Sequence, residues 1–195
     1  SILNSRTSKR KYNGEPLTLS ELAFLLWSTQ GVKSIAGRER KATFRTVPSA
    51  GARHPFETYL LINHVVGLDP GLYHYLAISH ELEYLGVIEN QVERVSEAFL
   101  GQKFFVTAPV DFIWSVIPYR SEWRYTTDAH KYALVDAGHV CQNLYLACEA
   151  IGCGTCAIGA YDQPLADQLM GFHKASSADN DAEFVVYAAS VGKPE

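Results

Sequence analysis

The stretch Arg6-Thr7-Ser8-Lys9-Arg10, near the start of the chain, is the segment that says most about the fold, together with Pro48-Ser49-Ala50-Gly51. Side chains at alternate positions of an extended segment point the same way, so Arg6, Ser8 and Arg10 converge on one ligand. Guanidinium groups favour bidentate contact with phosphate. Gly51 ends a turn of small residues, which lets the backbone approach a flat ligand. Taken alone, the alternating basic pattern fits a solvated terminus equally well.

Two later segments add to these motifs. Residues 130–147 read HKYALVDAGHVCQNLYLA, and residues 154–161 read GTCAIGAY. In this order and spacing the four motifs resemble the nitroreductase-like FMN-dependent oxidoreductase superfamily, and within it the thiazole- and oxazole-forming peptide dehydrogenases. The resemblance covers residues 6–193. It implies an α+β fold with a mixed sheet flanked by helices, in an intertwined homodimer with two FMN molecules at its interface.

The resemblance also implies which residues bind FMN. Arg6 and Ser8 would hold the phosphate and ribityl end, Arg10 would lie near the pyrimidine edge of the ring, and Lys193 would add charge at the phosphate. The partner subunit's residues 48–51 would line the ring, and the backbone of residues 157–160 would face its reactive nitrogen. The implied FMN-binding residues are Arg6, Thr7, Ser8, Arg10, Pro48, Ser49, Ala50, Gly51, Ala157, Ile158, Gly159, Ala160 and Lys193.

The sequence departs from the family pattern at two places. Many nitroreductases carry Glu and Gly where this chain has Gly159 and Ala160, which leaves a backbone contact in place but puts a side-chain role in doubt. The tail that usually follows the basic residue at Lys193 is also absent from this sequence.

Lys131 and Tyr132 are the candidate catalytic residues. An adjacent Lys-Tyr pair at this point is implicated in catalysis in the azole-forming dehydrogenases, where a base takes a proton from carbon while hydride leaves. A desolvated lysine beside a flavin can serve as that base. The alternative is a solvated Lys131 and a packing Tyr132, because adjacent helical residues do not face the same side.

Other polar residues of these motifs remain open. His54 and His139 fit satisfied core histidines better than ligands. Asp136, Gln142 and Asn143 either hydrogen-bond a flavin or support packing, and the sequence does not choose between the two roles.

Composition and charge limit the classes of protein to which this chain can belong. A chain of 195 residues with 47% hydrophobic residues predicts one globular domain over residues 1–195. Residues 1–53 carry ten Lys and Arg against three Asp and Glu, and the remainder carries seven against eighteen. No aromatic interleaving or known DNA-binding pattern accompanies this charge, so an anionic small ligand explains it better than nucleic acid. No apolar run reaches the ~20 residues that span a bilayer.

The four cysteines, Cys141, Cys148, Cys153 and Cys156, form no disulfide framework. Cys153 and Cys156 have C-x-x-C spacing, which is typical of a redox pair or half a zinc site, but a structural zinc site usually needs two such pairs. Buried, inert thiols are the favoured interpretation, and no metal is expected. Together with the absence of a signal peptide, this predicts a cytoplasmic protein.

Hydrophobic periodicity outlines the elements. A capping box at residues 18–21 opens a helix that stops near Gly31, and a mobile loop is expected over residues 31–41. Residues 121–127 suggest a polar-aromatic connection that could act as a lid. The apolar stripe of a long helix over residues 130–151 provides a face for the core or a dimer contact. Strands are expected at 56–66, 71–75, 82–85, 109–117, 155–160 and 184–191, and further helices at 91–100 and 164–170. Because strands and helices do not alternate regularly, the pattern favours α+β over a doubly wound sheet.

Three functions follow. The leading one is an FMN-dependent oxidoreductase that carries hydride from NAD(P)H through flavin to a small nitro- or quinone-like acceptor by ping-pong transfer. The second is an azoline-ring dehydrogenase of a peptide-modifying complex. The third is a flavin-binding or flavin-degrading protein without redox turnover.

Overall fold

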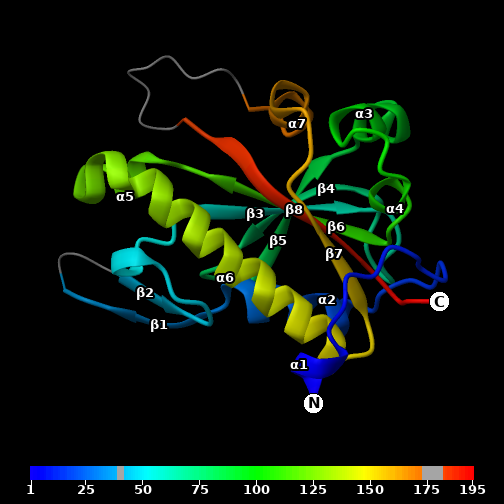
Figure 1. The fold of residues 1–195 in the computed structure, drawn as a ribbon, viewed down its shortest axis with the longest axis horizontal. Coiled ribbons are helices and arrows are strands. Elements are labelled where there is room, and N and C mark those ends of the chain that lie inside the picture. Colours follow the sequence, from blue (N-terminus) through cyan, green and yellow to red (C-terminus); the bar gives the residue numbers. More distant parts are fainter. Residues whose placement is uncertain (39–41, 173–181) are drawn as a thin grey trace.

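A six-stranded sheet organises the molecule, which a computed structural model describes over residues 1–38, 42–172 and 182–195 (Figure 1). Neighbouring strands of this sheet all pair antiparallel. Within the described ranges, parallel pairing is confined to isolated bridges, Ser8 with Thr155 and Leu17 with Val65. Across the sheet the order is β5 (Glu81–Gly86), β4 (Gly71–Leu76), β3 (Phe56–Ile62), β6 (Val110–Val116), β8 (Phe184–Gly192) and β7 (Gly154–Ile158).

Helices cover both faces of the sheet, so the expected α+β fold with a sheet flanked by helices is confirmed (Figure 1). One layer contains α2 (Leu19–Gln30) and α6 (Ala129–Ala150). The other contains α3 (Gln91–Ala98), α4 (Lys103–Val106) and α7 (Gln163–Leu169). Since side chains alternate along a strand, Leu60 and Phe112 enter the core under α2 and α6, whereas Leu61 and Ile113 enter the core under α3 and α7.

The central strands show why long apolar runs predicted buried strands. All seven residues of β6 are buried, because each face of this strand meets a helical layer. Helix α2 begins with the expected capping box: Thr18 accepts from the Glu21 N–H, and the Glu21 carboxylate accepts from the Thr18 N–H at 2.7 Å. Local signals of this strength placed the elements within a few residues of their observed bounds.

The apolar stripe of α6 is mostly a core contact within one chain. Ala137, Val140, Cys141, Leu144 and Cys148 are all buried against the sheet and α2. Leu134, the first residue of the predicted stripe, is instead 68% exposed. A dimer contact therefore cannot use the buried stripe.

Two connections differ from expectation. Part of the segment predicted as a loop at residues 31–41 forms β1 (Val32–Ala36), which pairs antiparallel with β2 (Ala42–Arg45); residues 39–41 lie outside the described residues. The lid-like connection at residues 121–127 is instead the helix α5 (Tyr119–Tyr125) followed by the turn η2 (Thr126–Asp128). Both segments are largely exposed, so they lack the hydrophobic periodicity that identifies an element in sequence. The remaining short elements are α1 (Ile2–Ser5) and η1 (Ala50–Ala52).

Candidate active site

The N-terminal motif is fastened to α6 and β7 by one tyrosine. The Tyr145 hydroxyl lies 2.9 Å from the Ser8 hydroxyl and accepts from the Ala157 N–H at 2.9 Å. The Arg6 guanidinium lies over the Tyr145 ring, 5.1 Å from its centroid. Ser8 also forms its bridge to Thr155 of β7. Arg6 and Ser8 are thus both held against Tyr145 beside β7, and their convergence with Arg10 on one ligand stays a prediction.

Arg10 lies on the other side of Ser8. Its guanidinium is 5.8 Å from the centroid of the Phe104 ring, and it approaches the Cys156 thiol, which Ser8 also approaches. Burial raises the pKa of Cys156, and the nearby Arg10 charge acts against that rise. Ser8 and Arg10 line a hollow of about 300 Å³ together with Lys9, Lys11, Pro194 and Glu195. Three basic side chains outnumber the Glu195 carboxylate there, so the hollow favours an anion.

The backbone after β7 is open to a flat ligand. Gly159 and Ala160 are exposed, and their N–H groups donate to no backbone acceptor among the described residues. A Cβ atom added at Gly159 would meet only the Tyr187 ring within 4 Å, at 3.8 Å. The Ala157 N–H, by contrast, is already used by Tyr145. Of residues 157–160, the last two therefore fit the contact with a flavin ring that the resemblance implies.

Residues 48–51 pack against the first half of α6, at Asp136. The Ala50 N–H donates to both carboxylate oxygens of Asp136 at 3.3 Å. Burial raises the pKa of Asp136, although the Ser49 hydroxyl and the Ala50 N–H hydrogen-bond to it. Gly51 has a φ of 56°, and a Cβ atom there would lie 2.3 Å from the Tyr125 hydroxyl. Asp136, whose role the sequence left open, thus shapes the turn.

The two halves of the predicted FMN site lie apart within one chain. Asp136 holds the turn at residues 48–51, and Tyr145 holds residues 6–8. These residues are nine positions apart on one helix, which corresponds to roughly 13 Å along its axis. One chain therefore brings Arg6, Ser8, Arg10 and the end of β7 together, but not Pro48, Ser49, Ala50 and Gly51.

Lys193 has carboxylate neighbours of its own. Its ammonium lies 3.7 Å from Glu15 and 3.8 Å from Glu21. Opposite charges at this range offset the positive charge that Lys193 could offer to a phosphate. Its role in phosphate binding stays a prediction.

Lys131 and Tyr132 lie in the first turns of α6 and face different surroundings. Lys131 is exposed, while Tyr132 is half-buried with its ring 4.8 Å from the Tyr125 ring, edge to face. The preceding residue, His130, lies 3.3 Å from the Glu122 carboxylate. This arrangement agrees with the helix geometry that separates adjacent side chains, and the catalytic role of the pair stays a prediction.

The other open residues divide between core and surface. His54 is buried, and desolvation together with the charge of Arg45 lowers its pKa to about 4. Asn143 supports packing, since its Nδ2 donates to the Ser28 carbonyl at 2.8 Å. His139 and Gln142 are exposed on α6, so the expectation of a core histidine at His139 is wrong.

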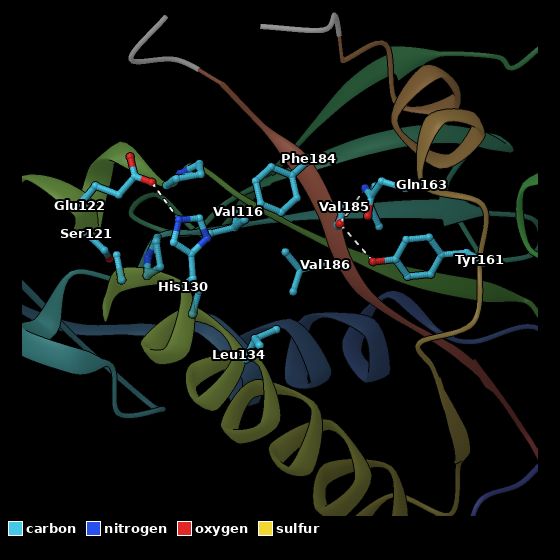
Figure 2. Close-up of a pocket in the computed structure, with 14 residues that line it drawn as sticks. Val116, Ser121, Glu122, His130, Leu134, Tyr161, Gln163, Phe184, Val185 and Val186 are labelled. Atoms are coloured by element: carbon cyan, nitrogen blue, oxygen red, sulfur yellow. Dashed lines mark hydrogen bonds and ion pairs between the residues drawn. The ribbon is translucent and has the colours of Figure 1, made fainter. Parts of the chain in front are cut away.

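A pocket of about 220 Å³ opens between the start of α6, the start of β8 and the loop after β7 (Figure 2). Its walls are mostly apolar, with Val116, Leu134, Phe184 and Val186 among them, and the His130–Glu122 pair lies at one end. At the other end the Tyr161 hydroxyl donates to the Val185 carbonyl at 3.0 Å. Tyr161 directly follows Gly159 and Ala160, so the pocket adjoins the open backbone.

All four cysteines are free and buried, as predicted from the sequence. Burial raises the pKa of Cys141 to about 12 and that of Cys153 to about 11, so both thiols are protonated near neutral pH. Within the ranges that the structure covers, no three His, Cys, Asp or Glu side chains are grouped to hold a metal ion. No helix in those ranges is long and apolar enough to cross a membrane.

Comparisons with known proteins show relatives of this chain. A protein of Methanocaldococcus jannaschii named as a nitroreductase is 35% identical over 170 residues, which cover 86% of this chain and 82% of that protein. The trifolitoxin-processing protein TfxB of Rhizobium leguminosarum bv. trifolii is 30% identical over 112 residues, or 55% of this chain and 30% of TfxB. This second likeness fits the resemblance to peptide-modifying dehydrogenases.

Structural similarity extends over the whole chain. The crystal structure of a protein from Ralstonia eutropha jmp134, described as a nitroreductase, superposes with a TM-score of 0.77 at 23% identity, covering 100% of this chain and 81% of that one. At this identity the likeness speaks for the fold. The model of the nitroreductase family matches residues 3–193. The fold, the N-terminal motif fastened to β7 and this match together make the chain a member of the nitroreductase family, and hence an oxidoreductase.

Proposed function

We propose that the protein is an FMN-dependent oxidoreductase that transfers hydride from NAD(P)H to a small nitro- or quinone-like acceptor. The observation that carries this proposal is that Arg6 and Ser8 are held by Tyr145 beside β7 and Arg10 lies near Cys156 of the same strand, while the open backbone of Gly159 and Ala160 follows the strand's last residue. A phosphate-binding end and a ring-facing end on one strand match the shape of FMN. When bound, FMN supplies the group that accepts and returns hydride.

On this proposal, different residues bind different parts of FMN. Arg6 and Ser8 hold the phosphate and ribityl end, and Tyr145 positions both of them. Arg10 places a cation beside the ring, which stabilises negative charge there. The Gly159 and Ala160 N–H groups offer donors toward the reactive edge, without a side-chain contribution.

The pocket beside Tyr161 is the proposed place for the acceptor. Its volume of about 220 Å³ lies below the ~300–1,000 Å³ of typical pockets for drug-sized ligands, which favours a small acceptor. Donor and acceptor would use the same exposed face in turn, so ping-pong kinetics follow. The apolar walls exclude water and favour an aromatic ring.

A homodimer completes the site on this proposal. Residues 48–51 of one subunit would line the ring held by residues 6–10 of the other, because a single chain keeps them apart. Leu134 and Val135 of α6 are 68% and 50% exposed and offer an apolar face for the contact. Light scattering tests this: a monomer holding stoichiometric FMN contradicts it. We also keep the single domain over residues 1–195 and a reducing, cytoplasmic location as parts of the proposal, since four free cysteines suit such a compartment.

The visible spectrum of the purified protein, recorded without oxygen, tests the cofactor and the donor together. A yellow protein that releases FMN on heating and is bleached by NADH or NADPH supports the proposal. A colourless protein that takes up no FMN contradicts it. Bound flavin that no reductant bleaches favours the third function, flavin binding or degradation without turnover.

The likeness to the trifolitoxin-processing protein favours a second candidate, an azoline-ring dehydrogenase acting in a peptide-modifying complex. Lys131 and Tyr132 separate the two. Direct hydride transfer from nicotinamide needs no protein base, so Lys131→Ala and Tyr132→Phe should leave the stopped-flow rate of flavin reduction by NAD(P)H within a few-fold. Oxidation of an azoline ring needs a positioned base, whose loss costs ~100- to 10,000-fold. The exposed position of Lys131 favours the first outcome.

A further inference from the structure

A second pocket, of about 400 Å³, is lined by three arginines that the sequence motifs did not single out. Arg45 comes from β2, Arg53 follows η1, and Arg120 comes from α5. Arg45 and Arg53 are eight residues apart, but Arg120 is distant in sequence and joins them only in the folded chain.

Positive charge exceeds negative charge in this pocket. Glu57 is the one carboxylate that lines it among the described residues, and it already pairs with Arg120 and with His74, the latter at 2.9 Å. The hydrogen bond to Glu57 raises the pKa of His74, so this contact stabilises the protonated imidazole. Arg45 and Arg53 are left without an ion-pair partner in the described part of the chain.

Arg45 is the most informative of the three. It is half-buried, and its guanidinium donates only to neutral groups among the described residues: to Gln30 Oε1 at 2.9 Å and to Thr43 Oγ1 at 3.3 Å. Burial lowers the pKa of Arg45, and the nearby Arg120 charge lowers it further, whereas the Glu57 carboxylate acts in the opposite direction. Glu57 is already shared by Arg120 and His74, so it offsets only part of the repulsion between the arginines, and a further anion would offset more.

The pocket adjoins the turn at residues 48–51. The Arg53 Nε donates to the Gly51 carbonyl at 3.1 Å, and its guanidinium lies 5.0 Å from the centroid of the Trp123 ring. A group bound between the arginines therefore lies next to the backbone that, on the proposed function, lines the flavin ring. A molecule that reacts at the ring could reach the pocket with a charged end.

We propose that Arg45, Arg53 and Arg120 form an oxyanion site that binds the phosphate or carboxylate end of a substrate of the flavin centre. Guanidinium groups suit both anions, because their parallel N–H donors match two oxygens at once. The use of this site in catalysis rests on the proposed function, whereas anion binding itself does not.

Binding of inorganic phosphate to the protein as purified, measured by calorimetry at low ionic strength, tests the site without turnover. Arg45→Gln should weaken binding about 10-fold or more, since a charge-assisted hydrogen bond is lost. Arg94→Gln, which removes the same charge from α3, should leave it unchanged. If Arg45→Gln does not fold, Arg53→Gln provides a second variant for the same phosphate-binding measurement. Arg6→Ala removes a charge from the proposed FMN phosphate site, so it distinguishes phosphate bound there from phosphate bound between the three arginines. Equal phosphate affinity in Arg45→Gln, Arg53→Gln and Arg94→Gln overturns the proposal.

Kinetics then identify the anion's source. A rise of about 10-fold or more in the ratio of KM for NADPH to KM for NADH in Arg45→Gln assigns the site to the phosphate that distinguishes the two reductants. A similar rise for a nitrobenzoate relative to nitrobenzene assigns it to the acceptor's carboxylate. Phosphate binding without flavin turnover would uphold the anion site and reject the proposed function. If phosphate binding is lost in Arg45→Gln but neither KM ratio changes, the site does not serve the flavin centre and that part of the proposal fails.

Discussion

The Tyr145 hydroxyl offers the sharpest test of how the N-terminal motif is held. It links Ser8 to the Ala157 N–H, each at 2.9 Å, while its ring supports Arg6. Tyr145→Phe removes both hydrogen bonds and keeps the ring. The variant therefore asks whether residues 6–8 must be fastened to β7 for the cofactor to bind.

The expected cost follows from the two bonds lost. A typical intramolecular hydrogen bond contributes about 0.5–1.5 kcal/mol net. The Ala157 N–H is half-buried and Ser8 is exposed, so water replaces part of what is lost. The free energy of unfolding should fall by about 1–2 kcal/mol. FMN affinity should fall by roughly 5- to 30-fold if the same free energy holds Ser8 in its binding position.

Urea denaturation and fluorescence titration with FMN measure the two effects. Tyr73→Phe is a matched control: Tyr73 is 6% exposed, compared with 8% for Tyr145, and its hydroxyl donates to the Asp69 carbonyl at 2.8 Å, far from the N-terminal motif. Tyr73→Phe should lose stability but not FMN affinity. If both variants bind FMN as the wild type does, Tyr145 does not position the phosphate end and that reasoning is refuted.

Three further outcomes are expected. Arg6→Ala should weaken FMN binding by roughly 10- to 150-fold without unfolding the protein, because a charge-assisted bond of about 1.5–3 kcal/mol is lost; unchanged affinity in a fluorescence titration would make Arg6 a solvated terminal residue. Gly51→Ala should lower the melting temperature more than Gly14→Ala does in calorimetry, since both have positive φ but only Gly51 meets a tyrosine hydroxyl at 2.3 Å; equal shifts would mean that this contact gives way freely. His74 has a pKa raised by Glu57, so its contribution to stability is present below pH 6.5 and lost as pH rises through the raised value. Unfolding free energies across that range should therefore fall less steeply in His74→Gln, and parallel curves would contradict the assignment.

Sequence patterns predicted elements wherever burial is strong. Strand β6 is buried on both faces, and its mostly apolar sequence, interrupted by Asp111 and Ser115, identified it. The capping box at Thr18 fixed the start of α2, because its hydrogen bonds are local. In both cases residues within or next to the element carry a recognisable signal, although the strand partners of β6 are distant in sequence.

The same patterns did not predict features that depend on contacts with other segments of the chain. Strand β1 has mostly exposed residues and owes its conformation to pairing with β2. Tyr145 falls within a recognised motif, yet only the fold brings its hydroxyl to Ser8. Arg45 and Arg120 are scattered basic residues until β2 and α5 place them around one pocket. A single sequence does not specify such distant partners.

Helix α6 explains why the proposed site needs two chains. The first half of the helix holds residues 48–51 through Asp136, and the second half holds residues 6–8 through Tyr145. A rigid helix cannot bring these two positions together, but a two-fold axis can set Asp136 of one copy near Tyr145 of its partner. Each copy would then contribute to two equal sites. The exposed Leu134 and Val135 lie on this helix, where burial against a partner would stabilise the pairing. On this reasoning, a variant that dissociates the dimer keeps its phosphate-binding end but loses one wall of the ring site, and cofactor affinity should fall in step with dissociation.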